Sequence, residues 1–125
     1  MKKIIKFVLF LLLIIPTSTI ALSKDYNDYV GKYYNIKNDE KVNIYLFYSK
    51  ICPHCQKEEK YFETLKEKYQ DKINIYTYEV TENKTNNEIM KSLKKELKEN
   101  SQGVPFTIIG SKTFLGYDES LNERI

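Results

Sequence analysis

The side chains best suited to chemistry lie within four consecutive residues. Cys52 and Cys55 are the only two cysteines of the chain, and His54, which lies between them, is the only histidine. Two thiols this close can form and break a disulfide with each other, and a neighbouring imidazole can stabilise the reactive thiolate. The stretch Cys52-Pro53-His54-Cys55 therefore predicts thiol–disulfide exchange.

A metal site and an inert bridge are the alternatives for this motif. Cys52, His54 and Cys55 offer three ligands, but a closed zinc site needs a fourth, and the chain has no second cysteine pair or histidine to supply it. A structural disulfide across so short a loop restrains the unfolded chain very little. We therefore expect no metal and no organic cofactor, and a redox-active Cys52–Cys55 disulfide instead.

Residues 1–23 have the layout of a secretory signal peptide. Three lysines come first, an apolar run covers residues 7–15, and Ala21 and Ser23 have the spacing of a cleavage site. An uncleaved membrane anchor is the alternative, although the 16 residues from Phe7 to Leu22 fall short of the roughly 20 that a spanning helix needs. Both interpretations predict an exported, extracytoplasmic domain, either secreted or anchored to the membrane.

The charge balance excludes a nucleic-acid partner. Of the 20 basic residues, three precede residue 24, which leaves 17 basic against 17 acidic residues in the rest of the chain. Nucleic-acid binding needs a basic face, and the excess charge here belongs to the targeting segment. Export places the cysteines where disulfides persist. The abundance of Lys, Ile, Asn and Tyr is typical of a bacterial, AT-rich genome.

The rest of the chain divides at Val42. Residues 24–41 are polar and tyrosine-rich without a firm period, and we expect a lead-in segment that packs a few tyrosines on the domain. A helical face made by Tyr26, Tyr29 and Tyr33 is the alternative. Residues 42–125 carry the signals of regular structure and are long enough for one domain only.

A strand, a helix and a strand are predicted first. Residues 42–48 form an apolar, β-branched and aromatic run that indicates a strand covered on both faces. Pro53 then suits the first turn of a helix that continues to residue 70, and residues 72–80 alternate as a second strand. Such a unit has parallel strands. The expected apolar stripe of the helix consists of Cys55, Phe62, Leu65 and Tyr69.

A second helix and a hairpin follow. The capping box Thr85-Asn86-Asn87-Glu88 predicts a helix over residues 85–100. Residues 106–109 and 112–115 read as two strands joined by the tight turn Gly110-Ser111, and a short helix closes the chain. The order β-α-β-α-β-β predicts an α/β fold, a four-stranded mixed sheet with helices on its faces.

The cysteine motif thus falls between the first strand and the first helix. At a helix N-terminus, unpaired N–H groups and the positive end of the dipole favour an anion, and a thiolate is such an anion. We expect Cys52 to be the exposed nucleophile, with His54 stabilising its thiolate. Cys55, one turn further, should face the core and resolve the mixed disulfide.

This arrangement resembles the thioredoxin-like superfamily over roughly residues 42–125. The resemblance is carried by the cysteine motif after the first strand, by Val104-Pro105 before the third, and by a glycine-aspartate turn after the last. It implies a cis peptide at Pro105 and a Val104 backbone that pairs with an extended substrate strand. It also implies a monomer that acts on protein thiols and disulfides and exchanges electrons with a redox partner, for which a membrane-bound carrier is one option.

Within the superfamily the signals are mixed. The Pro-His dipeptide is similar to that of the DsbA family of periplasmic oxidases, which however inserts a whole helical domain where this chain has one helix. The compact layout resembles glutaredoxins, but Leu115 replaces the first glycine of their glutathione-binding turn. Thioredoxins bury an aspartate in the first strand, where this chain has Leu46, so we expect the corresponding proton shuttle for Cys55 to be missing.

The sequence therefore predicts an enzyme, an exported thiol–disulfide oxidoreductase that acts on protein substrates. His54 favours oxidase or isomerase activity, and a reductant fed by a membrane electron carrier is the first alternative. The alternative from another class is a non-catalytic thioredoxin-like domain that presents Val104 and Pro105 to peptides.

Overall fold

The computed structural model describes residues 24–125, so the predicted signal peptide or anchor, residues 1–23, lies outside the described residues. Within the described part, no helix combines the length and the apolar character needed to cross a membrane. The elements follow in this order: α2 (Asn27–Val30), β1 (Val42–Tyr48), α3 (Pro53–Lys68), β2 (Ile73–Glu79), α4 (Lys84–Glu96), β3 (Phe106–Ile109), β4 (Lys112–Leu115) and the 3-10 helix η1 (Glu119–Glu123).

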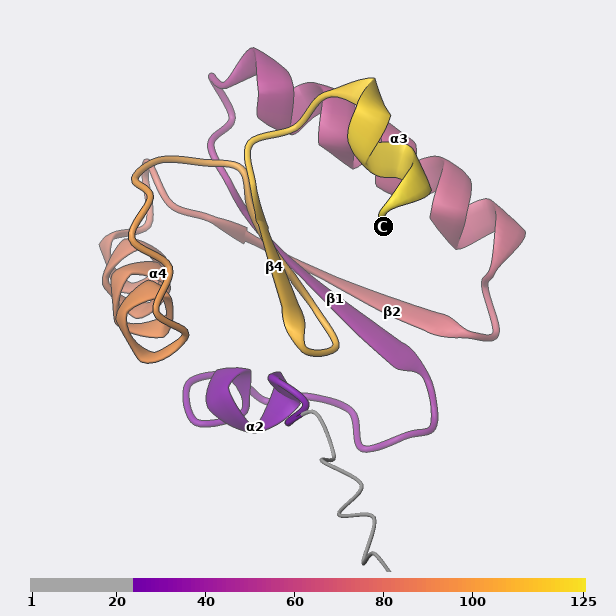
Figure 1. The fold of residues 1–125 in the computed structure, drawn as a ribbon, viewed down its shortest axis with the longest axis horizontal. Helices are drawn as coiled ribbons and strands as arrows, with labels where there is room; N and C mark the ends of the chain where they lie inside the picture. Colours follow the sequence, from indigo (N-terminus) through magenta and orange to yellow (C-terminus); the bar gives the residue numbers. More distant parts are fainter. Residues whose placement is uncertain (1–23) are drawn as a thin grey trace, which may run out of the picture.

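The four strands form one mixed sheet with the order β2-β1-β3-β4. β1 pairs in parallel with β2 and antiparallel with β3, and β3 and β4 form an antiparallel hairpin. α3 and η1 lie on one side of the sheet, and α2 and α4 lie on the other (Figure 1). The predicted α/β fold is confirmed, and β1, β3 and β4 have the predicted bounds.

β1 is the central strand and separates two apolar clusters. Tyr45 and Phe47 point into the cluster on the α4 side, whereas Ile44 and Leu46 point into the cluster on the α3 side. All four side chains are at most 3% exposed. This alternation follows from the two-residue period of a strand, and it explains why the run is apolar on both faces except for the buried Asn43.

The lead-in segment packs on the α4 side of the sheet. Val30 is fully buried, and the ring of Tyr34 stacks on that of Tyr78 with 3.9 Å between the centroids. The backbone N–H of Tyr26 donates a 2.8 Å hydrogen bond to the carbonyl of Gly110, which ties the segment to the β3–β4 turn. Tyr33, at 37% exposure, does not share this packing.

The predicted start of α4 is wrong. Its N-cap is Asn83, whose side chain accepts a hydrogen bond from the backbone N–H of Asn86, and the capping box proposed at Thr85 does not form the cap. Asparagine and threonine are both good N-caps, so the pattern alone did not separate them. The helix also ends earlier than predicted, because Lys98 adopts the left-handed conformation that ends many helices.

The buried stripe of α3 also differs from the prediction. Cys55 and Phe62 are buried as expected, but Tyr69 is 37% exposed and forms the C-cap. Glu58, which is not part of the predicted stripe, is fully buried between Cys55 and Phe62 on the helix. Its position three residues after Cys55 places it on the same face of the helix.

Candidate active site

Cys52 is the N-cap of α3, and Pro53 occupies the first turn of that helix. The Cys52 side chain is partly exposed, and its Sγ lies 3.8 Å from the carbonyl oxygen of Val104. The backbone of Cys52 is extended, as is usual for an N-cap residue. The predicted nucleophile and the predicted substrate-binding strand therefore meet at the same edge of the fold.

Hydrogen bonds hold the turn between β1 and α3. The N–H of Cys52 donates to the carbonyl of Ser49 at 3.1 Å, and the side-chain amide of Gln56 donates to the carbonyl of Lys50 at 2.9 Å. The hydroxyls of Ser49 and Thr81 are 2.6 Å apart, which links the turn to the end of β2. These contacts fix the position of the Cys52 sulfur relative to the sheet.

Cys55 is fully buried one turn into α3. Burial raises the pKa of its thiol to about 12, and the nearby side chains of Cys52 and Glu58 act in the same direction. Both cysteines are present as free thiols. The two sulfurs thus occupy different environments, one reachable from solvent and one kept protonated by its surroundings.

Glu58 is a candidate functional residue that the sequence interpretation missed. Its carboxyl group is fully buried, with one oxygen accepting a 2.7 Å hydrogen bond from the hydroxyl of Thr107. The other oxygen, Oε2, has no hydrogen-bond partner in the described structure. Burial raises the pKa of this carboxyl group to about 7, although the Thr107 hydrogen bond opposes the shift.

The structure adds a buried carboxyl group on α3 that the prediction of a missing strand aspartate did not anticipate. Leu46 does occupy the strand position, where it is fully buried, but α3 supplies a carboxyl group instead. The spacing of Cys55, Glu58 and Phe62 at one helical face was the signal that could have found it.

His54 is exposed and contacts the segment that follows β4. Its Nδ1 lies 3.0 Å from the carbonyl oxygen of Tyr117. Because a carbonyl only accepts, Nδ1 carries a proton in this hydrogen bond. Hydrogen bonds from Ser120, and the charge of His54 to a smaller extent, lower the pKa of the neighbouring Asp118. Stabilisation of the Cys52 thiolate by His54 stays a prediction.

The Val104–Pro105 peptide bond is cis. Val104 is partly buried and Pro105 is buried, directly before β3. The carbonyl of Pro105 accepts a 2.9 Å hydrogen bond from the N–H of Gly116, so β4 holds this segment in place. The structure thus brings Cys52, Pro53 and Val104 to one end of the sheet, and Cys55 lies beneath them.

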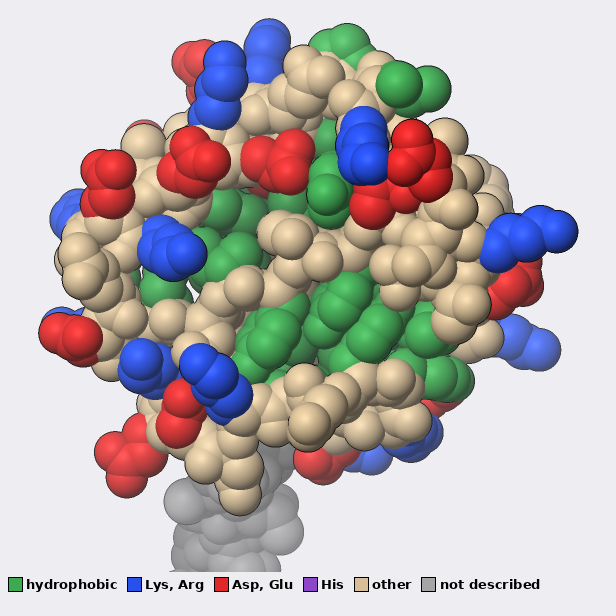
Figure 2. Space-filling view, turned by 180° about the vertical axis from the view of Figure 1, so that it is seen from behind, with side chains coloured by type: hydrophobic (Ala, Val, Ile, Leu, Met, Phe, Trp, Pro, Cys, Tyr) green, Lys and Arg blue, Asp and Glu red, His purple; other side chains and the backbone are tan. Residues whose placement is uncertain are grey.

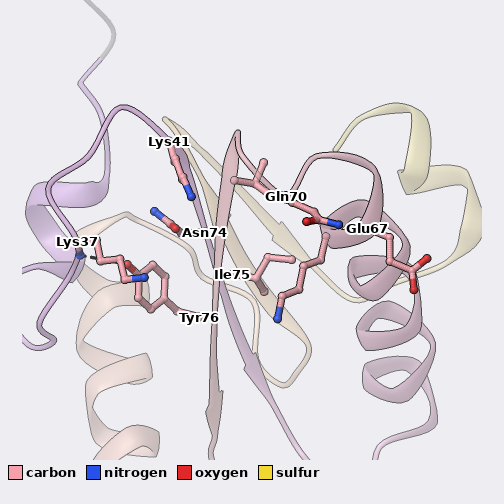
Figure 3. A pocket seen from close by; sticks show the side chains of 9 residues that line it. Lys37, Lys41, Glu67, Gln70, Asn74, Ile75 and Tyr76 are labelled. Atoms are coloured by element: carbon pink, nitrogen blue, oxygen red, sulfur yellow. Dashed lines mark hydrogen bonds between the residues drawn. The ribbon is translucent and has the colours of Figure 1, made fainter.

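A separate hollow lies at the other end of the sheet. It has a volume of about 450 Å³ and surrounds the start of β2, with Lys37, Lys41, Asn74 and Tyr76 among its lining (Figure 3). Seen from behind, hydrophobic side chains line hollows in the surface, and charged side chains surround them (Figure 2). Because β1 and β2 run in parallel and the cysteines follow the end of β1, this hollow is separate from the thiol site.

A metal centre has no support in the described part of the chain. Within residues 24–125, no group of three or more His, Cys, Asp or Glu side chains is arranged to hold a metal ion. The chemistry available at this end of the sheet is that of the two thiols and the buried carboxyl group of Glu58.

Comparison with known proteins shows the family of the chain. The thioredoxin family model matches residues 20–98, which is more than half of the chain. The chain belongs to the thioredoxin family. Among solved structures, a glutaredoxin from Archaeoglobus fulgidus is similar to it, with 17% sequence identity, a TM-score of 0.49, and coverage of 70% of this chain and 86% of the glutaredoxin. Comparison with curated proteins gave no match.

Membership of the thioredoxin family supports the coarse functional prediction, a protein of the thiol–disulfide oxidoreductase kind. The match covers the whole cysteine motif and helices α2, α3 and α4, so it also includes the lead-in segment. The resemblance assigned from the sequence began only at Val42, because residues 24–41 show no regular pattern.

Proposed function

We propose that the protein is an exported thiol–disulfide oxidoreductase that exchanges disulfides with protein substrates through Cys52 and Cys55. The observation that carries the proposal is the unequal pair of thiols at one helix N-terminus. Cys52 is partly exposed beside Val104, and Cys55 is fully buried one turn below. A substrate sulfur can therefore reach only one of the two.

The exchange proceeds in two steps. In the oxidising direction, a substrate thiolate attacks Sγ of Cys52, the Cys52–Cys55 bond breaks, and Cys55 leaves as a thiolate that takes up a proton. A second substrate thiolate then attacks the substrate sulfur of the mixed disulfide and releases the Cys52 thiolate. The substrate loses two electrons, and the cysteine pair gains them.

We propose that Glu58 holds the proton that Cys55 gains or loses. A thiolate at Cys55 is strongly disfavoured, because burial raises the pKa of this thiol to about 12. The Glu58 carboxyl group is buried one turn away, and its pKa of about 7 allows either protonation state near neutral pH. The free Oε2 atom is the site for this proton.

The direction we favour is oxidation or isomerisation. The Cys52 sulfur lies at the start of α3, where the unpaired N–H groups of a helix N-terminus are available to the sulfur of the reduced protein, and contacts made only in the reduced protein stabilise it relative to the disulfide. A protein whose reduced form is stabilised relative to its disulfide is a better oxidant than one without this stabilisation. The runner-up is a reductant that receives electrons from a membrane carrier.

Export is a further part of the proposal. It is supported by the composition of residues 1–23 alone, which have the basic start, apolar run and small residues of a signal peptide. Expression of the full chain in a bacterial host, followed by fractionation and mass measurement, tests it. A protein recovered intact from the cytoplasm contradicts export, and cleavage near residue 23 distinguishes a signal peptide from an anchor.

Activity is tested by insulin reduction and by oxidation of a reduced model protein. We expect wild type to catalyse at least one reaction, Cys52→Ser to abolish it, and Cys55→Ser to accumulate a mixed disulfide with the substrate. Equal rates for wild type and Cys52→Ser would mean that the domain is a non-catalytic peptide-binding module.

The direction is tested by equilibrating the cysteine pair with glutathione buffers. We expect a potential well above the roughly −270 mV of thioredoxin. A potential at or below that level favours the reductant.

A further inference from the structure

Lys94 is a charged residue buried close to the thiol site. It is 6% exposed, and its Nζ donates a 2.7 Å hydrogen bond to the carbonyl of Gly103, directly before Val104. The ammonium group also lies 5.1 Å from the centre of the Phe106 ring. An ammonium group has three donors, and only one of them has an acceptor among the described residues.

The acidic groups around Lys94 are already engaged elsewhere. None of the ion pairs within residues 24–125 includes Lys94. Glu99 is the charge that acts on it, but the Glu99 carboxylate accepts hydrogen bonds from Ser101 and Thr113. Burial lowers the pKa of the Lys94 ammonium group, and Glu99 only partly opposes this. A buried cation without a paired carboxylate is unfavourable unless an anion joins it.

A hollow of about 400 Å³ adjoins this cation. Lys94, Lys91 and Asn87 line it from α4, and Gln102 and Val104 line it from the segment that precedes β3. Its polar lining thus consists mainly of hydrogen-bond donors and amides. Lys91 pairs with the exposed Glu88 at 3.2 Å, so the buried charge that faces the hollow is that of Lys94.

The hollow begins where a substrate would bind. Val104 contributes to its wall, and the carbonyl of the same residue lies 3.8 Å from Sγ of Cys52. An extended peptide that pairs with the Val104 backbone places successive side chains on opposite sides of its strand. A side chain next to the reacting cysteine can therefore enter the hollow on the α4 side.

We infer that this hollow is a specificity site that binds the carboxylate of an aspartate or glutamate next to the reacting cysteine of a peptide substrate. This inference rests on the proposed thiol–disulfide exchange and names the substrate class that it favours. The carboxylate accepts the free donors of Lys94, and the amides of Asn87 and Gln102 supply further donors around it.

The test compares two disulfide-bonded peptides that differ only by Glu or Gln next to each cysteine. The reduced full-length protein transfers two electrons to the peptide, and the second-order rate is measured by mass spectrometry. Because a hydrogen bond to a charged group contributes roughly 1.5–3 kcal/mol, we expect the Glu peptide to react about 10-fold faster or more. Equal rates for the two peptides in wild type overturn the inference.

Substitutions of Lys94 distinguish binding of the peptide carboxylate from a purely structural role in holding the segment before β3. Lys94→Met should remove the preference, so that the Glu and Gln peptides react at the same rate, whereas Lys94→Arg should keep the preference for the Glu peptide. Lys95→Met is the matched control, because Lys95 is the exposed neighbour on the same helix. If Lys94→Met slows both peptides equally and keeps the preference, Lys94 only braces the loop and the inference is wrong.

A binding measurement keeps this inference distinct from the proposed function. Cys52→Ser protein is titrated calorimetrically with Glu and Gln peptides whose cysteines are replaced by alanine. Preferential binding of the Glu peptide that falls with added salt supports the site even if the protein catalyses no exchange. Glutathione disulfide serves as a second substrate. If Lys94→Met slows the reaction with glutathione disulfide but not the reaction with the Glu peptide, the hollow binds a carboxylate of glutathione, and the peptide assignment is overturned.

Discussion

The hydroxyl of Thr107 on β3 donates a 2.7 Å hydrogen bond to the Glu58 carboxyl group on α3. This bond satisfies one carboxyl oxygen and leaves the other buried without a partner in the described structure. It fixes the carboxyl group between the helix that carries both cysteines and the strand that follows Pro105. The fold thus keeps a titratable group in its core, three residues after Cys55 on the same helix.

Glu58 should make the stability of the protein depend on pH. Folding raises the pKa of its carboxyl group from 4.5 to about 7, so the unfolded chain releases this proton first as pH rises. The contribution of Glu58 to the free energy of unfolding is therefore fully present below about pH 4.5. It falls by roughly 3 kcal/mol as the pH rises to about 7. Glu58→Gln keeps a partner for Thr107 and removes this dependence. Urea unfolding of both proteins at about pH 5 and about pH 8 measures it.

The comparison that matters is the difference in unfolding free energy between the two proteins. Wild type should lose stability relative to Glu58→Gln as the pH rises. A difference that is the same at both pH values would mean that Glu58 ionises in the folded chain as it does in the unfolded one.

β1, β3 and β4 could be predicted to the residue because their signals are local, whereas β2 is one residue shorter at each end than the predicted range 72–80. In β1 every position from Asn43 to Phe47 is buried, so the apolar run and the strand coincide. Gly110, with a positive φ, marks the hairpin turn between β3 and β4. The start of α4 could not be placed as well, because Asn83 and Thr85 satisfy the same capping preference.

The burial of the charged residues was not predicted, although the spacing of Glu58 from Cys55 and Phe62 places it on the same helical face. Glu58 and Lys94 lie on the inner faces of amphipathic helices, where a periodicity argument counts charged residues as exposed. Only the structure shows that Thr107, 49 residues away in sequence, provides a partner for Glu58, and that the Gly103 carbonyl provides one for Lys94. The two cysteines were predictable as a pair, because their motif is contiguous, whereas the carboxyl group near them depends on tertiary packing.

The two thiols should differ sharply towards an alkylating reagent. Cys52 is partly exposed at a helix N-terminus, whereas Cys55 is fully buried and has a pKa raised to about 12. Brief treatment of the reduced, folded protein with iodoacetamide should therefore give a single adduct, located on Cys52 by peptide mass spectrometry. In denaturant both residues should react. Equal modification of Cys55 in the folded protein would contradict the asymmetry on which the exchange mechanism depends.

The corrected N-cap of α4 predicts which of two neighbouring residues matters for stability. The side chain of Asn83 accepts the N–H of Asn86 at 3.0 Å. Asn83→Ala should therefore lower the free energy of unfolding by about 1 kcal/mol. Thr85→Ala, at the position that the sequence pattern favoured, should change it by less than about 0.5 kcal/mol. Chemical denaturation, monitored by circular dichroism, measures the free energy of unfolding of the two variants. A larger loss for Thr85→Ala than for Asn83→Ala would mean that Thr85 caps the helix, as the sequence pattern predicted.

The lead-in segment should contribute to the stability of the domain through Val30. This side chain is fully buried in the cluster that contains Tyr45 and Leu93, so it joins α2 to both the sheet and α4. Val30→Ala leaves a small cavity there and should lower the free energy of unfolding by about 2 kcal/mol. Asp28→Ala is the matched control in the same helix, and because Asp28 is exposed it should change stability by less than about 0.5 kcal/mol. Equal, small effects of the two substitutions in urea unfolding would mean that residues 24–41 rest on the domain without stabilising it.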